Sequence, residues 1–297
     1  MTISTVSVIV ATYRRDSVLQ RALASLMEQT YKSFEIILVD DNDDSDWNNR
    51  IEKIVTDFKK SNPEVSLQYI QNHPSAGSAQ ARNAGIAAST GEYVCFLDDD
   101  DLYCPKRIEN QILPMRERNA DYSMTNLALY STSDKLIEVR KRGYIKETVP
   151  AALMRYHLMY HMTGTDTMMF RREYLVQIGG FPPIDVGDEF YLMEKAIQGG
   201  GTFLYVPVCD VKAYVHTGED GLSSGIGKIE GENRLFEYKK AYFEGLDKKA
   251  VRYIKTRHFV VLAYAYLRMR KIKDVIKYVT LGFITSPMQF LKILFVR

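Results

Sequence analysis

The chain has 297 residues, of which 46% are hydrophobic and 26% are charged. These proportions are ordinary for a folded protein, and the length allows one large domain or two small ones. The three cysteines include no CxxC pair, which excludes a zinc framework or a disulfide scaffold and fits a reducing cytosol. The chain starts without the charged segment, long apolar stretch and cleavage site of a signal peptide, so we expect a cytoplasmic protein.

The charges are unevenly distributed, although the net charge is only +2. Residues 246–297 contain 12 Lys and Arg against 2 Asp and Glu, and the preceding 245 residues contain 27 against 35. The tail therefore carries +10 and the body −8. An acidic body with a basic tail predicts two separate roles, with an anionic partner for the tail.

The first hundred residues alternate short apolar runs with segments of helical spacing. The predicted strands are Val6–Ala11, Glu35–Val39, Ser66–Ile70 and Tyr93–Leu97, and the predicted helices are Val18–Met27, about Trp47–Lys59 and Ala79–Ala88. Asp16 or Ser17 is the expected N-cap of the first helix. Because the strands are apolar throughout and alternate with helices, they predict a mostly parallel sheet with helices on both faces.

The second part of the chain has a less regular pattern. After a helix from Pro105 to about Asn119, we expect strands at Tyr122–Tyr130, Met162–Phe170, Phe203–Val206 and Val211–His216. Further helices are expected from Arg172 to Gly179 and from Asp188 or Glu189 onwards, and Ser133–Lys146 is either a hairpin or a mobile loop. We divide the chain into a domain at 1–228, with halves at 1–104 and 105–228, and a helical basic tail at 229–297.

Polar segments follow each of the first four predicted strands. They read ATYRR, DDND, HPSAGSAQARN and DDDD. In a parallel sheet ligands bind outside the carboxyl ends of the strands, so these segments should meet at one edge. The four adjacent aspartates, Asp98 to Asp101, repel one another, which favours a divalent cation beside them. Asp101 is alternatively the N-cap of the next helix.

The ordered set of motifs resembles that of family 2 glycosyltransferases of the GT-A fold, which build bacterial surface polysaccharides. The motifs are VSVIVATYRR, VDDND, AGSAQARNAGI, GEYVCFLDDDD, IGGF, GDEFYLMEKA and VHTGEDGLSS. They lie in roughly the first 225 residues, and the tail from about residue 230 lies outside the resemblance. The resemblance implies a Rossmann-like α/β fold and a metal-dependent, inverting transfer from a nucleotide sugar, with a UDP-sugar as the expected donor. The acceptor would be a glycan or a lipid-linked oligosaccharide.

The resemblance also assigns roles to residues of these motifs. Asp98 and Asp99 are expected at the nucleotide sugar and Asp100 at a Mn²⁺ or Mg²⁺ ion, with His216 as a further contact to the metal or the diphosphate. The remaining residues expected at the nucleotide sugar are Ala11, Tyr13 and Arg15 of ATYRR, Asp41 as the acceptor of the uracil N–H, and Arg82 and Asn83 of ARNAG. Gly85 is expected to allow close packing of its helix.

The general base is expected in GDEFYLMEKA, because inversion by direct displacement needs a carboxylate that takes the proton of the acceptor hydroxyl. The resemblance allows both Asp188 and Glu189. Acids at the start of a helix also stabilise its positive end, and one of the two is expected to do only that.

The tail contains two uncharged runs, His258–Leu267 and Thr280–Leu291. Both are shorter than the roughly 20 residues that span a bilayer. They fit basic amphipathic helices on an anionic membrane, and equally well helices packed on the catalytic domain. We therefore expect a peripheral protein on the inner face of a bacterial cell membrane, and no nucleic-acid partner.

Two other functions are compatible with parts of the sequence. A nucleotidyltransferase also places aspartates after strands, but it usually has a glycine-rich phosphate loop, and VIVATYRR contains no glycine. An inactive glycan-binding or membrane-binding module on the same fold is the other alternative. It is disfavoured because chemically competent residues fill all the expected polar positions.

Overall fold

The computed structural model describes residues 5–184, 187–215 and 225–295. The contacts divide the chain into two compact units. The α/β unit consists of Met1–Pro150 and Met162–Val215, and the helical unit consists of Ala151–His161 and His216–Arg297. All the site residues described below belong to the α/β unit.

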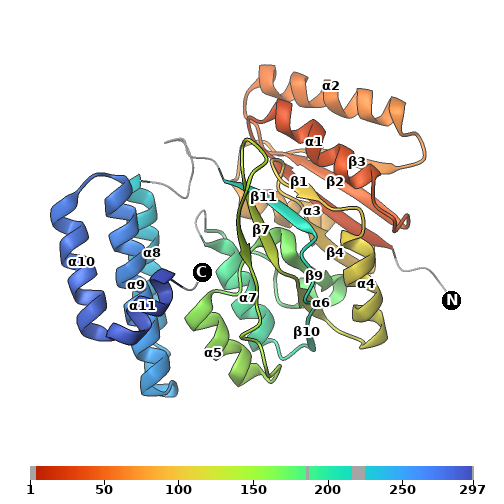
Figure 1. The fold of residues 1–297 in the computed structure, drawn as a ribbon. Coiled ribbons are helices and arrows are strands. Elements are labelled where there is room, and N and C mark those ends of the chain that lie inside the picture. Colours follow the sequence, from red (N-terminus) through yellow and green to blue (C-terminus); the bar gives the residue numbers. More distant parts are fainter. Residues whose placement is uncertain (1–4, 185–186, 216–224, 296–297) are drawn as a thin grey trace. The chain divides into compact units, whose positions relative to one another are not determined.

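A seven-stranded sheet is the centre of the α/β unit (Figure 1). Its strands, in spatial order, are β10 (Phe203–Tyr205), β6 (Tyr122–Met124), β9 (Met168–Arg171), β4 (Tyr93–Phe96), β1 (Val6–Thr12), β2 (Phe34–Asp40) and β3 (Ser66–Gln71). Neighbouring strands are parallel except for β9, which is antiparallel to both β4 and β6. The prediction of a mostly parallel sheet is confirmed.

Helices cover both faces of this sheet, as its continuous apolar strands predict. The helices are α1 (Asp16–Met27), α2 (Ser45–Ser61), α3 (Ser78–Ala88), α4 (Arg107–Glu117), α6 (Arg172–Gln177) and α7 (Asp188–Gln198). On one face Val6, Val8 and Val10 of β1 join a buried cluster with side chains of α1, α2 and α4. On the other face α3 packs on Ile9, and the ring of Phe96 packs edge-on against Phe181 at 5.1 Å.

The predicted strand Tyr122–Tyr130 is wrong, because the chain changes sheet in its middle. Residues after β6 form β7 (Leu127–Ser131), which belongs to a second, four-stranded sheet. That sheet has the order β5 (Leu102–Tyr103), β11 (Val211–Val215), β7 and β8 (Leu136–Arg140). The break occurs at Asn126, whose amide donates to the carbonyl of Val208 and whose side-chain oxygen accepts from Tyr205 and the amide of Arg142. The hairpin alternative for Ser133–Lys146 is confirmed by β7 and β8.

Three local predictions also differ from the structure. The predicted strand Met162–Phe170 begins instead with a 3-10 turn, η1 (Thr165–Thr167), before β9. Helix α1 begins at Asp16 itself, so neither Asp16 nor Ser17 is its N-cap. Helix α5 (Pro150–Tyr160) was not anticipated.

The helical unit is built around α9 (Lys248–Arg268), the longest helix in the described part of the chain. Asp247 caps it by accepting from the amide of Ala250 at 2.8 Å. The other main helices of this unit are α5, α8 (Gly225–Lys240), α10 (Ile272–Thr285) and α11 (Pro287–Phe295). Helices α8, α10 and α11 all contact α9. The predicted helical, basic C-terminal extension is therefore confirmed, and in the described residues none of its helices is long and apolar enough to cross a membrane.

The packing of α3 on β1 depends on Gly85. A Cβ atom at this position would lie 2.5 Å from Cγ2 of Ile9, so the predicted close packing is confirmed. We expect Gly85→Ala to lower the free energy of unfolding by about 1–3 kcal/mol through overpacking, measured by urea denaturation. The matched control is Gly227→Ala in α8, where a Cβ atom meets nothing within 4 Å. That helical substitution should be neutral or stabilising by up to about 1 kcal/mol. Equal stability of Gly85→Ala and the wild type would contradict this account.

Candidate active site

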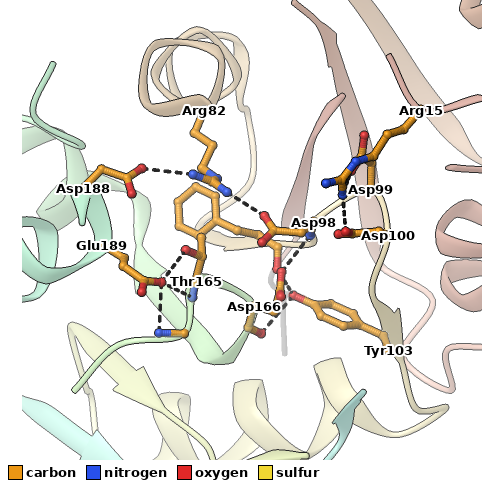
Figure 2. Close-up of polar contacts among 12 residues, drawn as sticks. Arg15, Arg82, Asp98, Asp99, Asp100, Tyr103, Thr165, Asp166, Asp188 and Glu189 are labelled. Carbon is orange, nitrogen blue, oxygen red and sulfur yellow. Dashed lines mark hydrogen bonds and ion pairs between the residues drawn. The ribbon is translucent and has the colours of Figure 1, made fainter. Parts of the chain in front are cut away.

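The carboxyl ends of β1 and β4 bring a threonine, an arginine and the run of aspartates together. Figure 2 shows Arg15 with Asp98, Asp99 and Asp100 of this group. Thr12, the last residue of β1, donates its hydroxyl to Asp99 at 2.7 Å. Arg15, three residues later, contacts Asp99 at 3.2 Å and also forms an ion pair with Asp100. Asp99 is buried, and burial raises its pKa to about 7 although Arg15 opposes the shift. Arg15 therefore forms ion pairs with two residues of the aspartate run.

Arg82 connects the aspartate run to the start of α7. Its guanidinium donates to Asp98 at 2.6 Å and to Asp188 at 3.0 Å, and it lies over the ring of Phe181. The side chain is almost fully buried, which by itself would lower the pKa of Arg82, but Asp98 and Asp188 outweigh burial and raise it. Arg82 is thus a permanent cation between two motifs that are about a hundred residues apart in the sequence.

A second group of carboxylates shares Asp98 with the first. Carboxylate oxygens of Asp98, Asp101 and Asp166 all lie within 4.8 Å of one another. Burial raises the pKa of Asp166 to about 7, and burial together with Asp166 raises the pKa of Asp101 well above its usual value. The buried pair of Asp101 and Asp166 therefore keeps a proton near neutral pH when no cation is bound.

Asp101 and Asp166 also hold backbone segments in place. Asp166 accepts from the amide of Asp98 at 2.7 Å, and Asp101 accepts from the amide of Tyr214 in β11 at 2.8 Å. Asp101 is not the N-cap of α4, since Lys106 occupies that position. The carbonyl of Asp166 accepts in turn from the fully buried Arg107 at 2.7 Å. These bonds fix the loop that carries the aspartates against both sheets.

Asp166 was not among the residues predicted from the sequence. It lies in MTGTDTMMF, where it is the only charged residue in a stretch that otherwise contains apolar, threonine and glycine residues. A lone carboxylate in such a stretch is expensive to bury unless it is paired. The single carboxylate in this stretch was therefore the sequence feature that could have identified Asp166.

The two candidate bases have different surroundings. Asp188 is buried and forms the ion pair with Arg82, and burial raises its pKa to about 6. Glu189 is half-buried and accepts three hydrogen bonds, from the amides of Gly164 and Thr165 and from the hydroxyl of Thr165, at 3.1–3.2 Å. All three bonds go to Oε2 and none of them to Oε1 (Figure 2).

Two residues expected at the nucleotide are already engaged with neighbouring loops. Asp41 accepts from the backbone amides of Ala76 and Gly77 and from the side chains of Asn72 and Ser75. These four bonds tie the end of β2 to the loop before α3 and match the acceptor capacity of one carboxylate.

Asn83 has a corresponding role at the other end of the site. Its side chain both donates to the carbonyl of Phe181 at 2.8 Å and accepts from the amide of Phe181 at 2.9 Å. The turn that it holds is the IGGF motif, in which Gly180 has a φ of +54°. A Cβ atom on Gly180 would lie 2.6 Å from the side-chain oxygen of Asn83, so this position requires glycine.

The remaining predicted residues divide into two groups. Tyr13 lies just beyond β1 and is 48% exposed, and Ala11 is half-buried inside β1. His216 and most of the GEDGLSSGIG segment lie outside the described residues.

Comparison with known proteins identifies the family. A family model described as glycosyl transferase family 2 matches residues 7–179, more than half of the chain. The chain belongs to this family. Membership of this family favours glycosyl transfer over the nucleotidyltransferase alternative.

Curated relatives support this assignment. An uncharacterized glycosyltransferase of Rickettsia felis is 33% identical over 144 residues, which are 48% of this chain and 23% of that protein. The Escherichia coli enzyme named UDP-Glc:alpha-D-GlcNAc-diphosphoundecaprenol beta-1,3-glucosyltransferase WfgD is 28% identical over 144 residues, 48% of this chain and 54% of that protein. The matches span only 19% to 58% of the lengths of such relatives.

Solved structures show the same fold over nearly the whole chain. Crystal structures of residues 1–349 of S. aureus TarS superpose with TM-scores of 0.60 and 0.62 at 19% and 18% identity. They cover 94% and 96% of this chain and 72% and 82% of the TarS chains. The first of them is a complex with UDP-GlcNAc. The predicted GT-A fold is confirmed.

The buried carboxylates give the metal-free protein a characteristic pH dependence. Asp99 and Asp166 keep their protons to about pH 7 in the folded state, whereas unfolded aspartates lose theirs near pH 4. The folded state therefore binds more protons between these values, so the free energy of unfolding falls as the pH rises from about 4 to 7. We expect Asp166→Asn to reduce this fall and to be more stable than the wild type at pH 8 in EDTA.

The measurement is urea denaturation of both proteins at several pH values. Asp57→Asn, on the exposed side of α2, is the matched control and should keep the pH dependence of the wild type. An identical pH dependence in Asp166→Asn and the wild type would show that Asp166 is ionised in the metal-free folded protein.

Proposed function

We propose that this chain is a metal-dependent, inverting glycosyltransferase that moves a sugar from a UDP-sugar to a glycan or lipid-linked acceptor. The proposal is carried by the charge balance of the site, where seven carboxylates gather around two arginines. These carboxylates are Asp98, Asp99, Asp100, Asp101, Asp166, Asp188 and Glu189, and the arginines are Arg15 and Arg82. The UDP-GlcNAc complex of TarS and the UDP-Glc donor in the name of WfgD support the choice of donor.

A divalent cation suits this arrangement because hard carboxylate oxygens are available and the site still carries excess negative charge. We assign Asp98 and Asp100 as its ligands. Their carboxylates contact arginine side chains, whereas Asp101 and Asp166 are buried and hold backbone amides. When bound, the metal would neutralise the diphosphate that leaves in the reaction. Arg15 and Arg82 hold the two carboxylates in place in the protein without metal.

For the nucleoside we retain two of the assignments from the sequence, Tyr13 and Asp41. Tyr13 is exposed at the end of β1, as a residue that stacks on a base should be. Asp41 directly follows the neighbouring strand β2, and we assign it to the uracil N–H, which would replace one of its bonds to the loop. Asn83 is engaged with Phe181, and we assign it to positioning that turn.

We assign Glu189 as the general base and Asp188 as the charge partner of Arg82. In the reaction the acceptor oxygen forms a bond to the anomeric carbon while the bond to the diphosphate breaks. The acceptor proton moves to the carboxylate, which in Glu189 offers Oε1 while Oε2 is anchored by Gly164 and Thr165. Attack opposite to the leaving group inverts the anomeric configuration. Asp188, buried and paired with Arg82, is poorly placed to receive this proton.

The assignment of the base predicts different kinetics for two neighbouring substitutions. Glu189→Gln should lower kcat by about 10²–10⁴-fold, with UDP binding retained, because the base acts on the acceptor. Asp188→Asn should instead remove the ion pair that positions Arg82. We expect this change to raise KM for the donor, with a smaller effect on kcat. Steady-state kinetics with separate variation of donor and acceptor distinguish the two. A large loss of kcat in Asp188→Asn beside a mild loss in Glu189→Gln would reverse the assignment.

The metal assignment predicts a specific loss of nucleotide binding. UDP should raise the melting temperature more with Mn²⁺ than with EDTA, and Asp100→Asn should remove this difference while keeping the fold. Asp57→Asn serves as the control variant and should behave like the wild type. Full transfer activity in excess EDTA, or in Asp100→Asn, would show that the enzyme needs no metal at this position.

The acceptor class also carries an expectation about location. The name of WfgD specifies a diphosphoundecaprenol acceptor, which is a membrane lipid. An enzyme with such an acceptor works at a membrane surface, and we propose a peripheral position on its cytoplasmic side. The basic helical unit supports this position.

A further inference from the structure

Exposed large apolar side chains are concentrated at the C-terminal end of the helical unit. Twenty large hydrophobic residues are exposed in the described part of the chain, and nine of them lie between residues 272 and 294. They are Ile272, Ile276, Val279, Leu281, Phe283, Ile284, Met288, Leu291 and Leu294. Single exposed hydrophobic residues are normal, but a concentration of them on two consecutive helices is typical of an interaction surface.

Four of these residues form one stripe along α10. Ile272, Ile276, Val279 and Phe283 follow the spacing i, i+4, i+7 and i+11, which places them on one side of the helix. Their exposed fractions are 57%, 62%, 39% and 47%. On another side of α10, Gly282 approaches the ring of Phe290. The ring of Phe283 meets Phe290 edge-on at 6.0 Å, so this end of the stripe is partly packed within the unit. The stripe therefore keeps much of its apolar surface exposed after α10 has packed within the unit.

Lysines border this stripe. Lys273 and Lys277 are exposed one turn apart on α10, next to Ile272 and Ile276 in the sequence. In α11 the exposed Lys292 is flanked in the same way by Leu291, and Met288 lies one turn away. Residues 268–297 contain seven Lys and Arg and a single acidic residue, Asp274.

We propose that α10 and α11 form a docking surface for an anionic lipid bilayer. Apolar side chains beside lysines match an interface where acyl chains adjoin negatively charged headgroups. In the described residues no helix is able to span the bilayer, so α10 and α11 would lie in the plane of the interface. This inference deepens the proposed function, on which it rests for the lipid-linked acceptor, by naming the face that meets the membrane.

The charge pattern favours a membrane over a second copy of the chain. Two copies meeting through the same face would bring their lysines together, and residues 268–297 contain only one acidic residue, Asp274, to compensate them. Like charges at an interface oppose association. An anionic lipid surface has the opposite sign, and each basic residue near it contributes about 1 kcal/mol to binding.

The test is sedimentation of the full chain with vesicles of equal parts phosphatidylglycerol and phosphatidylcholine. We expect binding at low salt, release at high salt, and much weaker binding to pure phosphatidylcholine. Ile276→Ser combined with Phe283→Ser should reduce binding by at least about tenfold, because both side chains would lose their burial in the interface. Lys273→Glu combined with Lys277→Glu should reduce it by a similar factor.

Each double variant has a matched control in the α/β unit. Leu136→Ser with Ile137→Ser removes two side chains of β8 that are 49% and 57% exposed, and Lys59→Glu with Lys60→Glu reverses two exposed charges on α2. Both controls should bind vesicles like the wild type. Circular dichroism checks that all variants are folded, and the UDP-induced shift of the melting temperature with Mn²⁺ should be the same in all of them.

These readouts separate the inference from the proposed function. Loss of vesicle binding in the α10 variants with an intact UDP response supports the docking surface. A wild type that ignores the anionic vesicles, or variants that bind them normally, would overturn it and leave the catalytic proposal in place. A dimer in light scattering that Phe283→Ser dissociates, without vesicle binding, would show that the face joins two copies. Vesicle binding without any UDP response would instead contradict the proposed function.

Discussion

Mutual repulsion among carboxylates at one edge of a sheet is the constraint on which the site depends. Four consecutive aspartates follow β4, and the fold adds Asp166, Asp188 and Glu189 to the same region. The protein compensates this charge in three ways. Arg15 and Arg82 form ion pairs with four of the carboxylates. Backbone amides donate hydrogen bonds to Asp101 and Asp166. Burial also keeps a proton on this pair of aspartates.

Such a cluster costs stability, because each buried carboxylate must remain protonated or be paired. A cation that entered the cluster would relieve this cost, so binding and folding would be linked. Arg82 has a special place in this balance, since it contacts both the aspartate run and the helix that carries the proposed base. A change of charge at Asp98 therefore alters the electrostatic environment of Asp188, because both carboxylates pair with Arg82.

The α/β unit could be predicted well from the sequence, because β1, β2 and β4 are continuous apolar runs and the helices between them have clear periodicity. The division of Tyr122–Tyr130 between two sheets could not, since the run is apolar throughout and its break depends on distant partners such as Val208 and Arg142. Helix α5 was not predicted either, because its packing partners are also distant in the sequence. It belongs to the helical unit, although its sequence interrupts that of the α/β unit.

Only part of the site could be predicted, because some of its residues lie in recognisable motifs and others depend on partners that are distant in the sequence. Motifs after strands identify residues that the topology brings to one edge, which is why Arg82, Asp98 and Asp188 could be named before their contacts were known. Asp166 could not, because its role comes from Asp101 and the amide of Asp98, and neither is near it in the sequence. The difference between Asp188 and Glu189 also depends on the fold, which gives one of them Arg82 and the other the amides of Gly164 and Thr165.

The central claim is that Asp98 and Asp100 hold a divalent cation at this edge of the sheet. The most direct test is a crystal structure of the protein with Mn²⁺ and UDP, with an anomalous difference map collected near the manganese absorption edge. The account predicts one strong peak in contact with the carboxylates of Asp98 and Asp100 and with the diphosphate. A peak between Asp101 and Asp166, or bound UDP without any manganese peak, would contradict it.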